Sequence, residues 1–292
     1  MQSSPQNILQ TGAPSQSAQR VAIARAVHQL LDEPLVFDDP LALPILGPDT
    51  ERLVRDDPFQ FNDLGARSMR AAIVARSRLV EDELQRAVRA GVMQYVVLGA
   101  GLDTFSLRNP YRDAGLRTYE VDHPATQRSK QAMLRQASIS VPESAIFVGV
   151  DFEKDALAEK LREAGFRADR PACLSWLGVT VYLEAAAVMQ TLAFVAGLPK
   201  GSSIVFDYRV RSELLNPMEQ MMERFSANMF TAMGEPWKSS FDPAELQRQL
   251  GAMGFTDIEN LGPEELNARY FAKRKDGLQT GGGGFRFVRA RV

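Results

Sequence analysis

The stretch Tyr95–Arg108, YVVLGAGLDTFSLR, passes from an apolar run through two glycines to polar residues around Asp103. An apolar run that ends in a tight turn before a helix is typical of a parallel strand, and open α/β sheets bind ligands at such strand ends. Gly99 and Gly101 lack a Cβ atom, so a ligand can approach the main chain closely there. We therefore predict a nucleotide-like ligand at this turn.

The turn departs from the dinucleotide-binding fingerprint at one position. That motif continues to a third glycine, whereas this chain has Thr104 and follows the pattern GxGxD. Without the third glycine, a pyrophosphate packed on the helix end is less favoured, and a nucleoside without phosphate fits better. The alternative is that the two glycines form an ordinary turn.

Two acids follow at the ends of later strand-like runs. Asp122 closes RTYEVD, 21 residues after Gly101, where a carboxylate can accept hydrogen bonds from both hydroxyls of a ribose. Asp151 closes AIFVGVD, where it can accept from an adenine amino group while Phe152 offers a flat apolar neighbour to the ring. Either aspartate could instead cap the helix that follows it. Their occurrence at successive strand ends favours a nucleoside site.

A charged residue lies on the apolar face of a helix predicted over residues 68–90. At 100° per residue, Arg76 shares that face with Met69, Ile73, Val80, Leu84 and Ala87. A guanidinium there needs a partner, and its fork matches the carboxylate of an amino acid. The alternatives are pairing with a protein acid such as Glu83, or a head group that reaches solvent. Ribose, adenine and an amino-acid carboxylate together describe S-adenosylmethionine.

The overall composition favours small-molecule chemistry. Of 292 residues, 45% are apolar and 24% charged, and 34 basic residues nearly balance 36 acidic ones. No strong net field would draw the chain to nucleic acid or to an anionic membrane. Cys173 is the sole cysteine and His28 and His123 the only histidines, so we expect neither an internal disulfide nor a zinc cluster. No metal is therefore expected in the site.

We expect a cytoplasmic protein. The polar N-terminus MQSSPQNILQTGAPSQ lacks the apolar region of a signal peptide. The longest apolar stretch, ACLSWLGVTVYL, is too short to span a bilayer.

Short β-rich runs alternate with helix signals after residue 91, which predicts an α/β fold with a mostly parallel sheet. The runs are QYVVLGA, RTYEVD, AIFVGVD, ACLSWLG and SIVFDY, followed by GFTDIENL and a closing edge strand in GGGGFRFVRARV. We expect a flexible arm over 1–16 and one domain over 17–292, composed of N-terminal helices (17–90), a cofactor-binding core (92–210), a cap insertion (211–243) and the last part of the sheet (244–292). The methionines of the cap segment could alternatively pack in the core.

Several motifs resemble one family when taken in order. VLGAGLDTFSLR, YEVDHP, VDF and SWLGVTVYL, preceded by VARSRLVEDEL and AQRVAIARAVHQLLDEPLVFDDPLA, look like the leucine carboxyl methyltransferase family, particularly its bacterial branch in secondary metabolism. The resemblance extends from about Ser17 to the C-terminus. It implies a class I methyltransferase, with a Rossmann-like seven-stranded sheet flanked by helices and S-adenosyl-L-methionine as the cofactor.

The resemblance also implies roles for individual residues. Arg76 would hold the methionine carboxylate, Gly99 and Gly101 the glycine loop, Asp122 the ribose, and Asp151 with Phe152 the adenine edge. Many members carry a glutamate where this chain has Leu177, so contact through backbone carbonyls around Trp176–Gly178 is expected instead. The expected cofactor-binding residues are Arg76, Gly99, Ala100, Gly101, Asp103, Asp122, His123, Asp151, Phe152, Trp176 and Leu177.

The methyl acceptor is less defined. Methyl transfer from a sulfonium is an in-line displacement, so a carboxylate acceptor needs no general base, whereas an alcohol or phenol does. Tyr182 and Tyr208 are candidates for an acceptor pocket, with plain core packing as the alternative for each. His123 could be a base or a helix cap. We predict an O-methyltransferase acting on a carboxylate or hydroxyl of a small metabolite; the alternatives are an NAD-dependent oxidoreductase and a non-catalytic S-adenosylmethionine-binding protein.

Overall fold

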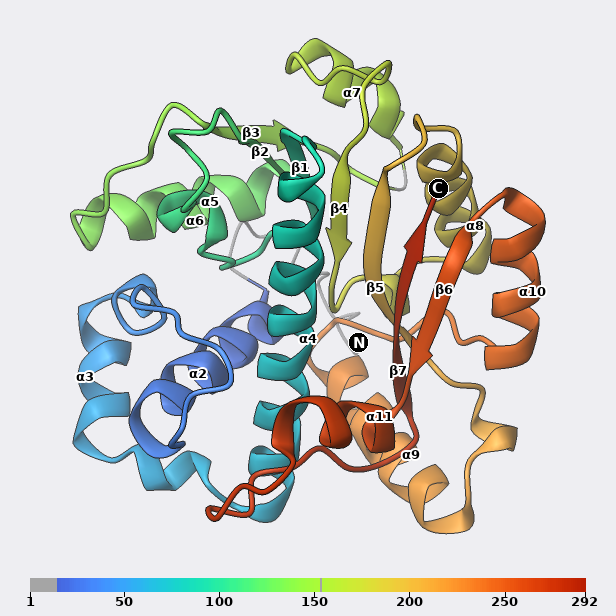
Figure 1. Ribbon diagram of the computed structural model, residues 1–292. Coiled ribbons are helices and arrows are strands. Elements are labelled where there is room, and N and C mark those ends of the chain that lie inside the picture. The colour runs from blue at the N-terminus through green and yellow to red at the C-terminus, as the bar shows by residue number, and fades with distance from the viewer. Residues whose placement is uncertain (1–14, 153) are drawn as a thin grey trace, which may run out of the picture.

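The computed structural model describes residues 15–152 and 154–292 (Figure 1). The expected arm falls almost entirely on residues 1–14, which lie outside the described part of the chain. The first helix, α2, already begins at Gln16, and its N-cap Ser15 accepts a hydrogen bond from the Ala18 N–H.

Seven strands form one sheet in the order β3-β2-β1-β4-β5-β7-β6. The first five pair in parallel, and β7 runs antiparallel to both β5 and β6. The strands are β1 Gln94–Leu98, β2 Arg117–Asp122, β3 Ala145–Gly149, β4 Cys173–Trp176, β5 Ser203–Arg209, β6 Thr256–Leu261 and β7 Phe285–Arg291. The predicted fold class, a mostly parallel seven-stranded α/β sheet, is confirmed.

The prediction of β7 as an edge strand is wrong. β7 lies between β5 and β6, so β6 forms that edge of the sheet. Phe287 of β7 is buried, and its neighbours in sequence include Arg289, which is also buried because Asp257 and Glu259 of the β6 segment hold its guanidinium. Phe287 and Arg289 are two residues apart and share one face of β7, so the charged residue on this face reflects the ion pairs of Arg289 rather than exposure to solvent.

Helices cover both faces of the sheet. The α-helices are α2 Gln16–Leu31, α3 Pro48–Asp56, α4 Leu64–Arg89, α5 Phe105–Arg108, α6 Pro124–Gln136, α7 Leu157–Glu163, α8 Ala185–Ala196, α9 Pro217–Ala232, α10 Pro243–Met253 and α11 Pro263–Leu266. Short 3-10 turns occupy η1 Pro44–Leu46, η2 Pro58–Phe61, η3 Thr180–Tyr182 and η4 Ser212–Leu214, and a π-helical turn, η5, occupies Asn267–Phe271.

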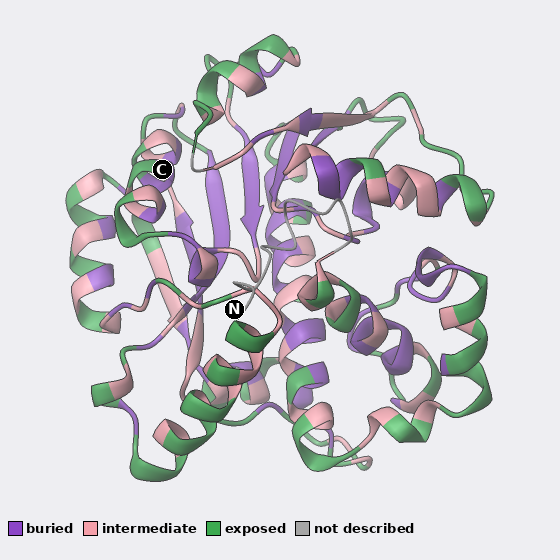
Figure 2. Ribbon diagram, turned by 180° about the vertical axis from the view of Figure 1, so that it is seen from behind, coloured by how far each residue is buried: buried purple, intermediate pink, exposed green. Residues whose placement is uncertain are grey.

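Two apolar clusters separate the sheet from its helices. The cluster on one face joins α4 and α5 to the strands, and the cluster on the other joins α7, α8 and α10. A third cluster packs α2 and α3 against Leu102 and Leu134. Figure 2 shows the central strands buried between helices whose outer faces are exposed. Every residue of β1 is buried, which explains the apolar run from Tyr95 to Leu98.

Helix α9 is the longest element of the segment 211–243, which was expected from the sequence to be a cap. None of its residues is buried, and Met218, Met221 and Met222 are each more than half exposed. Those methionines therefore do not pack in the core. The helix is fixed near the carboxyl end of β5, where Arg209 Nη1 lies 2.5 Å from Glu223 Oε1. No helix in the described ranges is long and apolar enough to cross a bilayer.

Candidate cofactor site

The predicted site residues follow strands that are parallel neighbours in the sheet. The glycine turn follows β1, Asp122 ends β2, and Leu177 and Gly178 follow β4. The carboxyl ends of parallel strands meet at one edge, so these residues lie side by side. The order of the sheet reverses between β1 and β4, which is the position where open α/β sheets bind ligands.

The glycine turn needs residues without side chains. Gly99 has φ +68° and Gly101 has φ +46°, both in the left-handed region. A Cβ at Gly99 would lie 2.2 Å from Val179 Cγ2, so no side chain fits there. The N–H groups of Gly99 and Ala100 donate to Val121 O at 2.8 and 3.0 Å. These two bonds tie the turn to β2.

Asp122 joins β2 directly to this turn. Its Oδ2 accepts a hydrogen bond from the Gly101 N–H at 2.6 Å, and its Oδ1 accepts one from the His123 N–H at 2.6 Å. Burial raises the pKa of the Asp122 carboxyl, and the two backbone donors oppose that rise. Each carboxylate oxygen has two lone pairs, so Asp122 can still accept further hydrogen bonds.

Two other predicted residues have structural partners. His123 is the N-cap of α6, and its Nδ1 accepts a hydrogen bond from the Ala125 N–H at 3.2 Å. Asp103 Oδ1 accepts from the Phe105 N–H at 2.8 Å, and its Oδ2 lies 3.6 Å from Arg25 Nη1. Both side chains shape the backbone around the strand ends.

Asp151 and Phe152, which follow β3, have different partners. Asp151 Oδ2 accepts a hydrogen bond from Lys154 Nζ at 2.8 Å. The Phe152 ring lies 6.4 Å from the ring of Trp176, at an angle of 30°. Trp176 is fully buried at the end of β4, and its Nε1 has no hydrogen-bond partner in the described part of the chain. The exits of β3 and β4 thus share an aromatic contact.

Arg76 reaches the same edge from helix α4. Its Nη1 lies 2.7 Å from Asp207 Oδ2, and 13% of its side chain is exposed. A Cβ at Gly178 would lie 3.2 Å from Arg76 Nη2, so the guanidinium lies over the loop after β4. Pairing with Glu83 does not occur; that carboxylate is bound by Arg86 and Arg291 instead.

Asp207, the partner of Arg76, was not among the residues predicted from the sequence. It lies in the apolar run SIVFDY of β5 and is 2% exposed. An acid inside such a run was the available signal, because a buried carboxylate requires a partner. Its Oδ1 also accepts a hydrogen bond from the Gly178 N–H at 2.7 Å.

The two tyrosines predicted for the acceptor pocket differ. Tyr182, half-buried in η3, packs edge-to-face against Phe230 of α9, with ring centroids 6.3 Å apart. Burial raises its pKa to about 12. Tyr208 is fully buried, and its hydroxyl hydrogen-bonds with Asn260 of β6. It packs in the cluster against α8 and α10, on the face of β5 opposite Asp207, so its placement in an acceptor pocket is corrected to core packing.

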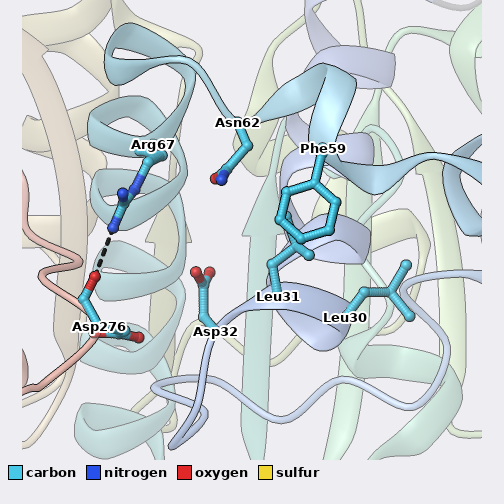
Figure 3. Close-up of a pocket in the computed structure, with 7 residues that line it drawn as sticks. All are labelled: Leu30, Leu31, Asp32, Phe59, Asn62, Arg67 and Asp276. Atoms are coloured by element: carbon cyan, nitrogen blue, oxygen red, sulfur yellow. Dashed lines mark hydrogen bonds between the residues drawn. The ribbon is translucent and has the colours of Figure 1, made fainter.

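A separate cavity of about 360 Å³ lies between α2, η2 and the start of α4 (Figure 3). It is lined by Leu30, Leu31, Asp32, Phe59, Asn62, Arg67 and Asp276. Arg67 Nη2 donates to Asp276 O at 2.7 Å across it, and Arg70 binds Asp32. None of the predicted site residues lines this cavity. Its charged side chains have protein partners: Arg67 bonds to the backbone of Asp276, and the carboxylates of Asp32 and Asp276 bind arginines outside the lining, which is typical of a structural network.

Comparison with known proteins places this arrangement in a family. The model of the family described as leucine carboxyl methyltransferase matches residues 18–196, more than half of the chain. The chain belongs to the leucine carboxyl methyltransferase family. The matched range contains every predicted cofactor-binding residue, and it ends before Asp207 and α9.

Relatives of this family member extend beyond the matched range. The chain is 32% identical over 282 residues to the "Putative S-adenosyl-L-methionine-dependent methyltransferase YktD" of Bacillus subtilis, covering 89% of this chain and 92% of that protein. A protein of Mycobacteroides abscessus with the same description is 30% identical over 241 residues, covering 82% of this chain and 76% of its own length.

Two solved structures share the fold of this family member. The crystal structure of a methyltransferase from Thermobifida fusca, titled as putative, aligns with a TM-score of 0.58 at 18% identity and covers 98% of each chain. A protein of Streptomyces avermitilis from the family titled duf574 aligns with a TM-score of 0.55 at 16% identity, covering 95% of this chain and 97% of its own.

Proposed function

We propose that the protein transfers a methyl group from S-adenosyl-L-methionine to an oxygen of a small metabolite, a carboxylate in preference to a hydroxyl. Family membership makes it an S-adenosyl-L-methionine-dependent methyltransferase. The observation that carries the proposal is the meeting of Arg76, the glycine turn and Asp122 at one edge of the sheet.

The residues at this edge fit the cofactor. Asp122 lies directly beside the glycine turn and retains lone pairs for ribose hydroxyls. Arg76 uses Nη1 on Asp207, which leaves further N–H groups of its fork for a carboxylate. Phe152 offers a flat apolar ring beside the strand ends, where adenine would pack.

The chemistry of the neighbouring side chains favours a carboxylate acceptor. When bound, the cofactor supplies an electrophilic methyl group, and the protein has to align an acceptor oxygen with it. Tyr182, with its pKa raised to about 12, keeps its proton at neutral pH and is a hydrogen-bond donor rather than a base. His123 uses Nδ1 to cap α6. An ionised carboxylate needs no base, so it suits this set of residues.

Nothing in the turn favours the alternative NAD-dependent activity. Thr104 stands where the fingerprint needs its third glycine. Its side chain is fully buried, and its hydroxyl donates to Asp39 Oδ2 at 2.8 Å. The third glycine of the fingerprint allows the helix to pack closely against the strand, and a buried threonine side chain at this position does not match that arrangement.

Ligand-dependent unfolding tests the cofactor, and the product's chemistry tests the acceptor. S-adenosylhomocysteine at a hundred times its Kd should stabilise the fold by about 2.7 kcal/mol, whereas NAD should leave the Tm unchanged. A shift with NAD alone would overturn the proposal. Labelled methyl groups incorporated into an extract of the source cells should then be released by mild alkali, as an ester requires. Alkali-stable label would indicate an ether or an N-methyl product and would contradict a carboxylate acceptor.

A further inference from the structure

We propose that Asp207 is a positioning residue that directs Arg76 toward the amino-acid carboxylate of the cofactor and couples it to the loop after β4. The inference rests on the proposed function, because it concerns the same cofactor site. The family match ends at residue 196, so it does not extend to this part of β5.

Asp207 contacts both parts of the site with separate oxygens. Oδ2 lies 2.7 Å from Arg76 Nη1, and Oδ1 accepts the Gly178 N–H at 2.7 Å. The side chain is 3% exposed, so water cannot replace either contact. A buried carboxylate is costly unless it is paired, and here a helix and a loop provide both partners.

The guanidinium is held from two sides. Asp207 fixes Nη1, while the absence of a Cβ at Gly178 leaves room for Nη2, which lies 3.2 Å from the position that a Cβ would take. Gly178 has φ +70°, a conformation that other residues adopt with strain. A planar guanidinium fixed at one nitrogen has its orientation largely determined, and its remaining N–H groups then face a set direction.

The end of β5 is fixed independently of the carboxylate. The Thr180 hydroxyl donates to Asp207 O at 2.6 Å, and Thr180 is buried. Asp207 also pairs with Phe287 in the ladder between β5 and β7. The backbone position of Asp207 therefore does not depend on its ion pair, so a change of its side chain should act mainly on Arg76 and on the loop.

Comparing the binding of two ligands can distinguish a positioning role of Asp207 from a general contribution to the stability of the fold. S-adenosylhomocysteine carries the amino-acid carboxylate, and 5′-methylthioadenosine shares its nucleoside but lacks that group. Asp207→Asn keeps an oxygen for the Gly178 N–H and removes the charge that holds Arg76. We expect the Kd for S-adenosylhomocysteine, measured by titration calorimetry, to rise about tenfold or more, as for loss of a charge-assisted hydrogen bond. The Kd for 5′-methylthioadenosine should stay unchanged.

Controls distinguish this inference from the proposed function. Thr180→Val removes a hydrogen bond to the backbone of Asp207 and should leave the ratio of the two Kd values as in the wild type. Arg76→Ala combined with Asp207→Asn should be no weaker for S-adenosylhomocysteine than Arg76→Ala alone. If the asparagine variant does not fold, Asp207→Ser also removes the charge and allows the same two Kd values to be measured. Equal losses for both ligands, or no loss for either, would overturn the positioning role; a wild-type protein that binds neither ligand would overturn the proposed function with it.

Discussion

Glu83 of helix α4 accepts a hydrogen bond from Arg291 of β7, with Oε2 and Nη2 2.8 Å apart. This contact joins the helix that carries Arg76 to a strand near the C-terminus. Arg86 donates from Nε to the same carboxylate at 3.0 Å, and Glu83 is only 3% exposed. Burial alone raises the pKa of Glu83, but the hydrogen bonds from Arg86 and Arg291 outweigh it and lower the pKa to about 2.

This lowered pKa predicts an acid-sensitive contribution to stability. The ordinary pKa is 4.5, so the contribution is complete above that value and is lost as the pH falls toward 2. The shift corresponds to roughly 3 kcal/mol at neutral pH. In urea unfolding, Glu83→Gln should be clearly less stable than the wild type at pH 7, and the difference should narrow at pH 3. The exposed Glu213→Gln serves as the control and should match the wild type at both values; an undiminished gap at pH 3 would contradict this assignment.

Cofactor binding by Arg76 should require the two-pronged geometry of its guanidinium and not only its charge. Arg76→Ala should weaken binding of S-adenosylhomocysteine and lower the Tm, because Asp207 is left buried without its cation. Arg76→Lys keeps the charge but cannot bind a carboxylate bidentately while also contacting Asp207, so it should recover little affinity. Calorimetric titration of both variants checks this. Wild-type affinity in the lysine variant would rule out capture of the carboxylate by the fork.

Gly99 should tolerate no side chain. Gly99→Ala combines a left-handed backbone, φ +68°, with a clash at 2.2 Å against Val179 Cγ2. Gly115→Ala is the matched control, since it has φ +94° and no atom within 4 Å of the added methyl. The control should lose about 1–2 kcal/mol of unfolding free energy from the backbone alone. Gly99→Ala should lose more, and Val179→Ala in the same chain should restore part of the loss; equal losses for the two glycine variants would refute the steric explanation.

The closeness of the glycine turn and Asp122 could be predicted from the sequence, because parallel strands place their carboxyl ends at one edge of the sheet. Once the run before Gly99 and the run before Asp122 are recognised as neighbouring strands, their proximity follows from topology. The partner of Arg76 could not be predicted in the same way. Glu83 lies on the same helix as Arg76, but it contacts Arg291, which is more than two hundred residues away in the sequence.

Long-range packing also decides which of two neighbouring residues of β5 lies beside Arg76. Asp207 and Tyr208 are adjacent, so their side chains point to opposite faces of the sheet. The alternation alone does not say which face meets α4, because both faces of a central strand are covered. Tyr208 was the residue predicted from the sequence for the site, whereas the packing of α4 against β5 places Asp207 beside Arg76.

Substitution of Tyr182 and of Tyr208 should have different effects, because we expect one to contact the acceptor and the other to pack in the core. Tyr208→Phe removes the hydrogen bond with Asn260 and should cost about 1 kcal/mol of stability, with methyl incorporation per folded molecule unchanged. Tyr182→Phe removes a hydroxyl that stays protonated at neutral pH, since its pKa is about 12. Under the proposed function Tyr182 donates a hydrogen bond to the acceptor oxygen, so labelled methyl incorporation into source extract should fall in Tyr182→Phe. The Kd of this variant for S-adenosylhomocysteine should remain close to that of the wild type. These predictions are tested on both variants by unfolding curves, by calorimetry and by the incorporation assay. Unchanged incorporation with Tyr182→Phe would remove that tyrosine from the acceptor site.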